Sequence, residues 1–258
     1  MPIIPLNTSH KEPVSRVGGK AHALGRLIAF GAPVPPGFVI PPGPLDEAAV
    51  LKAFDKLGAK YVAVRSSAAG EDAGSQSWAG QFESYLYVSR DQLLERVAEC
   101  RLSGTSARAK AYDASSQGMA VAVVVQAMVA SDVAGVLFTV NPVTKADQVV
   151  IEAVFGLGEQ LVQGLATPDN YVFDKSSGDI TQTISLKLTR LVGSPGGVVE
   201  QPVDTADQDR PALSHEQCRE LAKLSTQLER SFGYPLDIEF AYAGARLYIV
   251  QARPITTI

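Results

Sequence analysis

Four polar residues near the C-terminus are the first candidates for chemistry in this chain. In the segment LDIEFAYAGARLYIVQARPIT, residues 236–256, Asp237 and Glu239 stand two apart, and Gln251 and Arg253 stand two apart beyond a short turn. Residues two apart on a β-strand share one face of the sheet. Carboxylate and amide oxygens are suitable ligands for Mg²⁺, and a guanidinium can hold a phosphoryl group through paired hydrogen bonds. The same alternation also fits a solvated strand face, and the pattern alone favours neither interpretation.

Whether the four side chains share one face depends on the turn between the two strands. A three-residue turn over 243–245 would place Asp237 opposite Gln251 and bring all four polar groups to one face. A two-residue turn over 243–244 would move Gln251 to the other face. The functional interpretation therefore predicts the odd-numbered turn, with Gly244 in the left-handed conformation.

Two further cations follow glycine-rich or small-residue segments. Lys20 comes directly after Gly18 and Gly19, at the start of a helical pattern, where free N–H groups and a positive charge suit an anion. Arg65 ends an apolar strand pattern and precedes a long run of small residues. Each of these residues, taken alone, is commonly a solvated surface residue. Together with Arg253 they could surround one polyphosphate.

The periodicity of apolar residues predicts the elements that must position these side chains. Helices are expected over 16–30, 45–57, 90–101, 106–113 and 215–231. Strands are expected over 37–40, 61–67, 120–129, 135–141, 148–154, 170–174 and 181–187, followed by the closing hairpin. Capping boxes, Ser89 with Gln92 and Ser214 with Gln217, mark two of the helix starts. The change from alternating helices and strands to mostly strands predicts a mixed N-terminal part, 1–116, and a strand-rich C-terminal part, 117–258.

Composition narrows the function classes. The chain has 258 residues, 46% of them hydrophobic and 19% charged, which is ordinary for a globular protein. A net charge of −4 argues against a broad nucleic-acid surface. Its two cysteines form no CxxC motif, and no apolar run reaches the length of a membrane span. With no signal-peptide pattern at the start, we expect a cytoplasmic protein without nucleic-acid or membrane partners.

Several segments together resemble a known family. The segments are VGGKAHALGRL, VPPGFVI, VAVRSSAAGED, SWAGQFES, VVVQAMVASDVAGVLFTVNPVT, VIEAVFGLGEQLVQGLATPDNYV and DIEFAYAGARLYIVQARP. They resemble the nucleotide-binding domain of phosphoenolpyruvate synthase and pyruvate phosphate dikinase, and rifampicin phosphotransferase has a similar domain. The resemblance covers nearly the whole chain, in the order in which the family has these segments.

The resemblance implies an α+β chain with the ATP-grasp fold, in which ATP lies between two α+β subdomains. The subdomains would be 1–116 and 117–258. The residues that it implies for the phosphates and for catalysis are Lys20, Arg65 and Arg253. Those that it implies for Mg²⁺ are Glu239 and Gln251, with Asp237 in support. Gln126 and Met128 match the adenine-binding hinge, Glu159 matches the position near the ribose, and the loop 68–84 matches the cover over the phosphates.

The chain departs from the family in two respects. It lacks the domain with the phosphorylatable histidine and the substrate-binding domain, and its own histidines are His10, His22 and His215. The region between GFVI and YVAVRSS, residues 41–60, leaves space for one helix where the family has several.

Three hypotheses follow for the function. The first is an ATP-dependent phosphotransferase that acts with a separate protein carrying the phosphohistidine and the substrate site. The second is a kinase that phosphorylates a small molecule directly, and the third is a non-catalytic nucleotide-binding module. Because every phosphate and metal position is retained, the third is disfavoured. A carboxylate–amine ligase of the wider ATP-grasp group lacks support from the segments.

Overall fold

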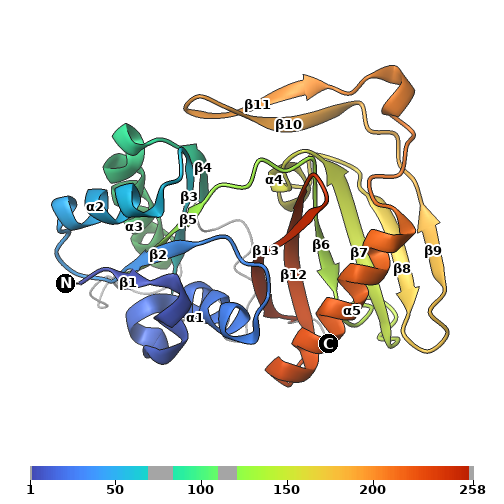
Figure 1. Cartoon of the computed structure of the whole chain (residues 1–258), viewed down its shortest axis with the longest axis horizontal. Helices are drawn as coiled ribbons and strands as arrows, with labels where there is room; N and C mark the ends of the chain where they lie inside the picture. The colour runs from blue at the N-terminus through green and yellow to red at the C-terminus, as the bar shows by residue number, and fades with distance from the viewer. Residues whose placement is uncertain (1, 69–83, 110–120, 256–258) are drawn as a thin grey trace. The chain divides into compact units, whose positions relative to one another are not determined.

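The computed structural model describes residues 2–68, 84–109 and 121–255, and the chain folds into two compact units (Figure 1). The N-terminal unit comprises Met1–Met128 with Ser194–Val198, and the C-terminal unit comprises Val129–Gly193 with Val199–Ile258. Each unit has its own antiparallel sheet. Within the described ranges, no helix combines the length and apolar character that crossing a membrane requires.

The N-terminal unit is built on a five-stranded sheet in the order β1-β2-β5-β3-β4. Its strands are β1 (Ile4–Pro5), β2 (Gly37–Ile40), β3 (Val62–Ser67), β4 (Ser84–Val88) and β5 (Ala122–Ala127). Its helices are α1 (Val14–Phe30), α2 (Glu47–Leu57) and α3 (Leu93–Ala109), with 3₁₀ turns η1 (Leu6–Lys11) and η2 (Arg90–Gln92).

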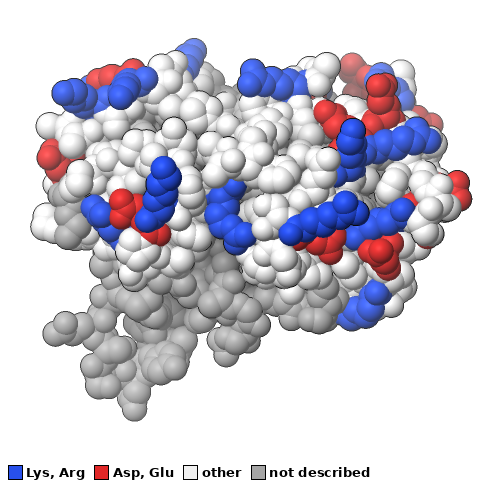
Figure 2. All heavy atoms as spheres, turned by 60° about the horizontal axis from the view of Figure 1, so that its bottom comes forward, with Lys and Arg blue, Asp and Glu red and all other residues white. Residues whose placement is uncertain are grey.

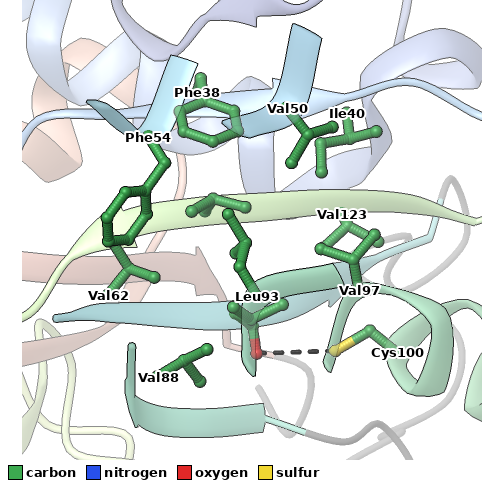
Figure 3. Packing of buried hydrophobic residues seen from close by; sticks show 12 residues of the cluster. Phe38, Ile40, Val50, Phe54, Val62, Val88, Leu93, Val97, Cys100 and Val123 are labelled. Carbon is green, nitrogen blue, oxygen red and sulfur yellow. Dashed lines mark hydrogen bonds between the residues drawn. The ribbon is translucent and has the colours of Figure 1, made fainter. Parts of the chain in front are cut away.

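Apolar side chains at alternate positions of the strands form the core of this unit. Alternate residues of β2, β3 and β5 point to the face that α2 and α3 cover, and Cys100 of α3 donates its thiol hydrogen to the carbonyl of Val64 (Figure 3). The buried cluster is Phe38, Ile40, Val50, Phe54, Val62, Val64, Val88, Leu93, Val97, Cys100, Val123 and Val125. Two helices and a sheet thus hold the strands that carry Arg65 and Gln126.

Local signals in the sequence explain where the helices begin and end. The Asp46 side chain caps α2, and the Ser89–Gln92 capping box opens the helical segment that continues into α3. Left-handed Gly31 and Gly58 end α1 and α2. The prediction of two helices over 90–101 and 106–113 is wrong up to residue 109, because α3 continues through Gly104 without a break.

The C-terminal unit has a six-stranded sheet in the order β13-β12-β6-β7-β8-β9. Its strands are β6 (Val133–Phe138), β7 (Gln148–Phe155), β8 (Asp169–Asp174), β9 (Ile180–Thr183), β12 (Leu236–Ala243) and β13 (Arg246–Pro254). The helix α5 (His215–Phe232) lies across one face of this sheet (Figure 1). The remaining elements are α4 (Glu159–Val162) and η3 (Thr205–Asp207). β10 (Thr189–Ser194) and β11 (Gly197–Pro202) form a separate hairpin, of which Ser194–Val198 belong to the N-terminal unit.

Three differences from the sequence predictions concern strands. The β10–β11 hairpin was not expected, and β9 ends at Thr183 rather than at residue 187. A division at residue 116 puts the strand expected over 120–129 in the C-terminal part, but β5 pairs with β2 and β3 of the N-terminal sheet. The division near residue 116 falls in the undescribed range 110–120, and the N-terminal unit extends to Met128.

A buried ion pair fixes the long connection between β9 and α5. Asp169 is fully buried and accepts hydrogen bonds from the Lys187 ammonium at 2.7 Å and from the backbone N–H of Ala212 at 2.7 Å. The hydroxyl of Tyr171 accepts the N–H of Leu213 at 3.0 Å. A charge buried in this way is tolerated only when it is paired and hydrogen-bonded, so these contacts hold the connection to the sheet.

Candidate functional site

The closing hairpin brings the four polar residues together in a register that differs from the predicted one. Glu239 lies opposite Gln251, and Asp237 lies opposite Arg253. The predicted pairing of Asp237 with Gln251 is therefore wrong, and so is the three-residue turn, because Ala243 pairs with Arg246 across two residues. Gly244 has a φ of 58°, which confirms its left-handed conformation.

A β-bulge supplies the one extra residue that a three-residue turn would have added between the two strands. Phe240 pairs with Ile249, but its neighbour Glu239 pairs with Gln251, so Val250 is the extra residue on β13. Without this extra residue the two-residue turn would place Gln251 opposite Ile238. The bulge therefore restores the common face of the four polar side chains.

This common face is the one that α5 does not cover. The hydroxyl of Tyr242 donates to Glu220 of α5 at 2.7 Å, which shows that Tyr242 points toward the helix. Asp237 and Glu239 lie at odd spacings from Tyr242 on the same strand, so they point the other way.

Asp237 and Arg253 form an ion pair on this face. The Nε and Nη2 atoms of Arg253 lie 2.9 and 2.8 Å from the same oxygen, Oδ2, of Asp237. Burial raises the pKa of Asp237, the charge of Arg253 opposes this rise, and the charge of Glu239 adds to it. The guanidinium thus supplies a counter-charge to a carboxyl group that is only 8% exposed.

The sheet adds two polar residues that the sequence analysis missed. Val136 of β6 pairs with Glu239 on one side and with Glu152 of β7 on the other, and Glu152 pairs with Asn170 of β8. Paired residues share a face, so Glu152 and Asn170 lie in the same row as Glu239. Burial raises the pKa of Glu152, and the charge of Asp237 adds to the rise. The feature of the sequence that could have indicated Glu152 is its position as an acidic residue inside the apolar run QVVIEAVF.

The donor set of the hairpin fits a hard cation bound together with a ligand. A carboxylate, Glu239, faces an amide, Gln251, across the strand pair. In the described part of the chain, no group of three or more His, Cys, Asp or Glu side chains could hold a metal alone. This fits Mg²⁺, which typically takes one or two protein carboxylates and completes its shell with phosphate oxygens and water.

In the N-terminal unit the structure brings Lys20 next to the strand that carries Arg65. The Lys20 side chain is 5% exposed, and its ammonium donates to the carbonyl of Ser66 at 2.9 Å. The backbone N–H of Gly19 donates to the carbonyl of Ala68 at 3.0 Å. Two cations of the predicted phosphate site are therefore held at one end of β3.

Gly18 makes this close approach possible. Its φ of 79° interrupts the helical backbone of α1, so a helical turn starts again just before Lys20. A Cβ atom at this position would overlap the carbonyl and hydroxyl oxygens of Ser67. Only glycine satisfies both the positive φ and the contact. The glycine-rich loop predicted at the helix entry is instead part of α1, which begins at Val14 and is interrupted at Gly18.

The other predicted residues lie in both units. Gln126 is 2% exposed, and its Nε2 donates to the carbonyl of Pro35 at 3.2 Å. The backbone N–H of Met128, just beyond β5, donates to the carbonyl of Tyr61 at 3.0 Å. Glu159 begins α4 and accepts a hydrogen bond from Gln163 at 3.2 Å. Their roles toward adenine and ribose stay predictions, and the covering loop lies, for 69–83, outside the described residues.

Comparisons with known proteins place this chain in a family. Residues 42–258 match the model of the pyruvate phosphate dikinase AMP/ATP-binding domain. The chain is 38% identical to the prodigiosin synthesizing transferase PigC of Serratia marcescens over 94% of this chain and 32% of that protein. It is 34% identical to a probable phosphoenolpyruvate synthase of Archaeoglobus fulgidus over 100% of this chain and 42% of that protein. The chain thus spans less than half of these relatives.

A solved structure shows the same fold. The crystal structure of the ADP complex of purK, N5-carboxyaminoimidazole ribonucleotide synthetase, matches with a TM-score of 0.50 and 10% identity, over 95% of this chain and 47% of that one. Similarity at this identity concerns the fold alone. The chain has the ATP-grasp fold and belongs to the family of the pyruvate phosphate dikinase AMP/ATP-binding domain.

Proposed function

We propose that this chain binds Mg²⁺ and ATP and transfers a phosphoryl or pyrophosphoryl group to a histidine of a separate phosphocarrier or substrate-binding protein or domain. The observation that carries the proposal is the convergence of Asp237, Glu239, Gln251 and Arg253 on the sheet face that α5 leaves uncovered. A bulge and an ion pair are needed to produce this arrangement, which a merely solvated strand face would not require.

Each residue has a distinct role in the proposal. Glu239 and Gln251 would hold Mg²⁺, which would supply positive charge to neutralise the phosphates. Asp237 orients Arg253 through their ion pair. The cations that bind the phosphates and offset the charge of the transferred group are Lys20, Arg65 and Arg253. Gln126 and Met128 bind adenine, and Glu159 binds the ribose.

This set of residues suits phosphoryl transfer, because that reaction needs mainly positioning and charge stabilisation. A neutral imidazole nitrogen of the acceptor attacks phosphorus, and a P–N bond forms as the P–O bond to the leaving nucleotide breaks. Transfer of the γ-phosphoryl group releases ADP, and transfer of the βγ-pyrophosphoryl group releases AMP. An imidazole needs no general base, and we assign that role to no residue of the chain.

The relatives support a histidine acceptor outside this chain. Several of them are probable phosphoenolpyruvate synthases, and the chain spans only about a quarter to under half of their lengths. PigC, by its name, is a transferase that synthesizes prodigiosin. This relative favours a second candidate function, direct phosphorylation of a small molecule.

The test uses radiolabelled ATP and a cell extract as the source of acceptors. We expect label from ATP to enter protein in an acid-labile, alkali-stable form only when the chain and Mg²⁺ are present, with ADP or AMP released in equal amount. Glu239→Gln is the matched inactive control. Label in a small molecule would support the second candidate. Chain-dependent label that is equal with the Glu239→Gln variant, or no release of either nucleotide, would contradict both.

A further inference from the structure

A basic groove lies on the face of the C-terminal sheet opposite to the face that carries Glu239 and Arg253. Phe173 of β8 and the following Lys175 continue the alternation of Tyr171, whose hydroxyl contacts the segment leading into α5 at Leu213. They therefore lie on the face that α5 covers. The residues that line the groove are Asp147, Phe173, Lys175, Arg219, Ala222, Lys223, Thr226, Gln227, Glu229 and Arg230.

One stripe of α5 forms a wall of this groove. Arg219, Lys223 and Arg230 recur at spacings of four and seven residues, which places them on one side of the helix. Figure 2 shows Lys and Arg side chains gathered over the surface that carries α5, with Asp and Glu side chains among them. A basic stripe on a helix is ordinarily a solvated face, but here it borders a cavity of about 560 Å³.

The acidic side chains of the groove do not neutralise this stripe. Asp147 and Glu229 both pair with Lys175, at 2.7 and 2.9 Å. Burial alone would lower the pKa of Lys175, but these two hydrogen-bonded carboxylates raise it. In the residues that the structure describes, Arg219, Lys223 and Arg230 have no such partner, so four basic and two acidic residues leave a net charge of +2.

We propose that this groove binds a small multivalent anion of the phosphate-ester class. Its volume lies in the range of small-ligand sites rather than of protein interfaces. Arg219, Lys223 and Arg230 supply the charge, and the Thr226 hydroxyl and the Gln227 amide can hydrogen-bond to phosphate or hydroxyl oxygens. The face of Phe173 offers an apolar surface for the remainder of the ligand. The groove lies on the other sheet face from Glu239 and Arg253, and the inference does not rest on the proposed function.

The test is a titration of the isotope-labelled full chain with inorganic pyrophosphate, observed through backbone amide NMR shifts. We expect saturable shifts in residues 219–230 and at Phe173 and Lys175 in the absence of Mg²⁺. In the double variant Arg219→Gln/Lys223→Gln, the affinity should fall by about tenfold, as for the loss of two exposed cation–anion contacts.

The matched control changes the same amount of charge elsewhere. Lys52 and Lys56 are exposed on α2, and Lys52→Gln/Lys56→Gln should leave the α5 shifts and their affinity unchanged. The inference is overturned if pyrophosphate shifts no α5 residue, if its affinity is the same in both double variants, or if the shifts gather only around Lys20 and Arg253. The last result would support the nucleotide site while excluding this one.

Discussion

Arg253 directs two donors to one oxygen of Asp237, at 2.9 Å from Nε and 2.8 Å from Nη2. The residues face each other across the closing hairpin, next to the pair formed by Glu239 and Gln251. The ion pair therefore ties the orientation of a predicted phosphate ligand to the strand register that also sets the predicted metal ligands.

The first prediction concerns this ion pair. Arg253→Ala leaves Asp237, 8% exposed, without its counter-charge, and should destabilise the C-terminal unit by about 1–3 kcal/mol, less than for a fully buried pair. Asp237→Asn in the same background should restore most of this loss. Urea denaturation measures both changes. Additive effects of the two substitutions would contradict the coupling.

Because Arg253 is also a proposed phosphate ligand, Arg253→Ala should abolish transfer in conditions where the chain is still folded.

The second prediction concerns Gly18. Gly18→Ala should destabilise the N-terminal unit by roughly 3 kcal/mol or more, because it combines a positive φ with overlap against Ser67. Gly58→Ala is the matched control, since Gly58 has a φ of 68° but nothing within 4 Å of an added Cβ. That variant should lose only about 1 kcal/mol. Thermal unfolding distinguishes them, and equal losses would show that the contact with Ser67 is unimportant.

Much of this fold follows from local signals in the sequence. The capping boxes at Ser89 and Ser214 and the left-handed glycines place the helix ends, because these signals act over a few residues. The pairing of β5 with β2 and β3 could not be predicted in this way, because an apolar strand does not indicate which sheet it joins.

In the candidate site, too, local signals in the sequence do not determine how the strands pair. The alternation of Asp237 with Glu239 was sufficient to predict a polar face, but the bulge at Val250 has no turn residue to mark it, and the register was therefore predicted wrongly. Glu152 joins the row only through Val136, which lies on a strand between them. Such a neighbour is set by sheet order, which periodicity within one strand does not encode.

The third prediction concerns Glu152 and pH. Burial and the charge of Asp237 raise its pKa in the folded state, so the folded chain binds more protons at this carboxyl than the unfolded chain. Its ionisation therefore reduces stability as pH rises from the ordinary carboxyl range through the raised pKa. Glu152→Gln should increase stability at neutral pH and leave it unchanged at pH 4 and below. Urea denaturation across this pH range is the measurement, and a loss of stability at neutral pH would contradict the assignment.

The account is tested most directly by calorimetric titration of the chain with ATP, with and without Mg²⁺, in wild type and in Glu239→Gln. We expect Mg²⁺ to strengthen ATP binding to the wild type by about tenfold or more, as expected for a cation shared by protein and phosphate. The Glu239→Gln variant should lose this dependence, and Lys52→Gln, an exposed control on α2, should keep it. A well-folded wild type that binds no ATP, or Mg²⁺-dependent binding that Glu239→Gln leaves unchanged, would contradict the proposed site.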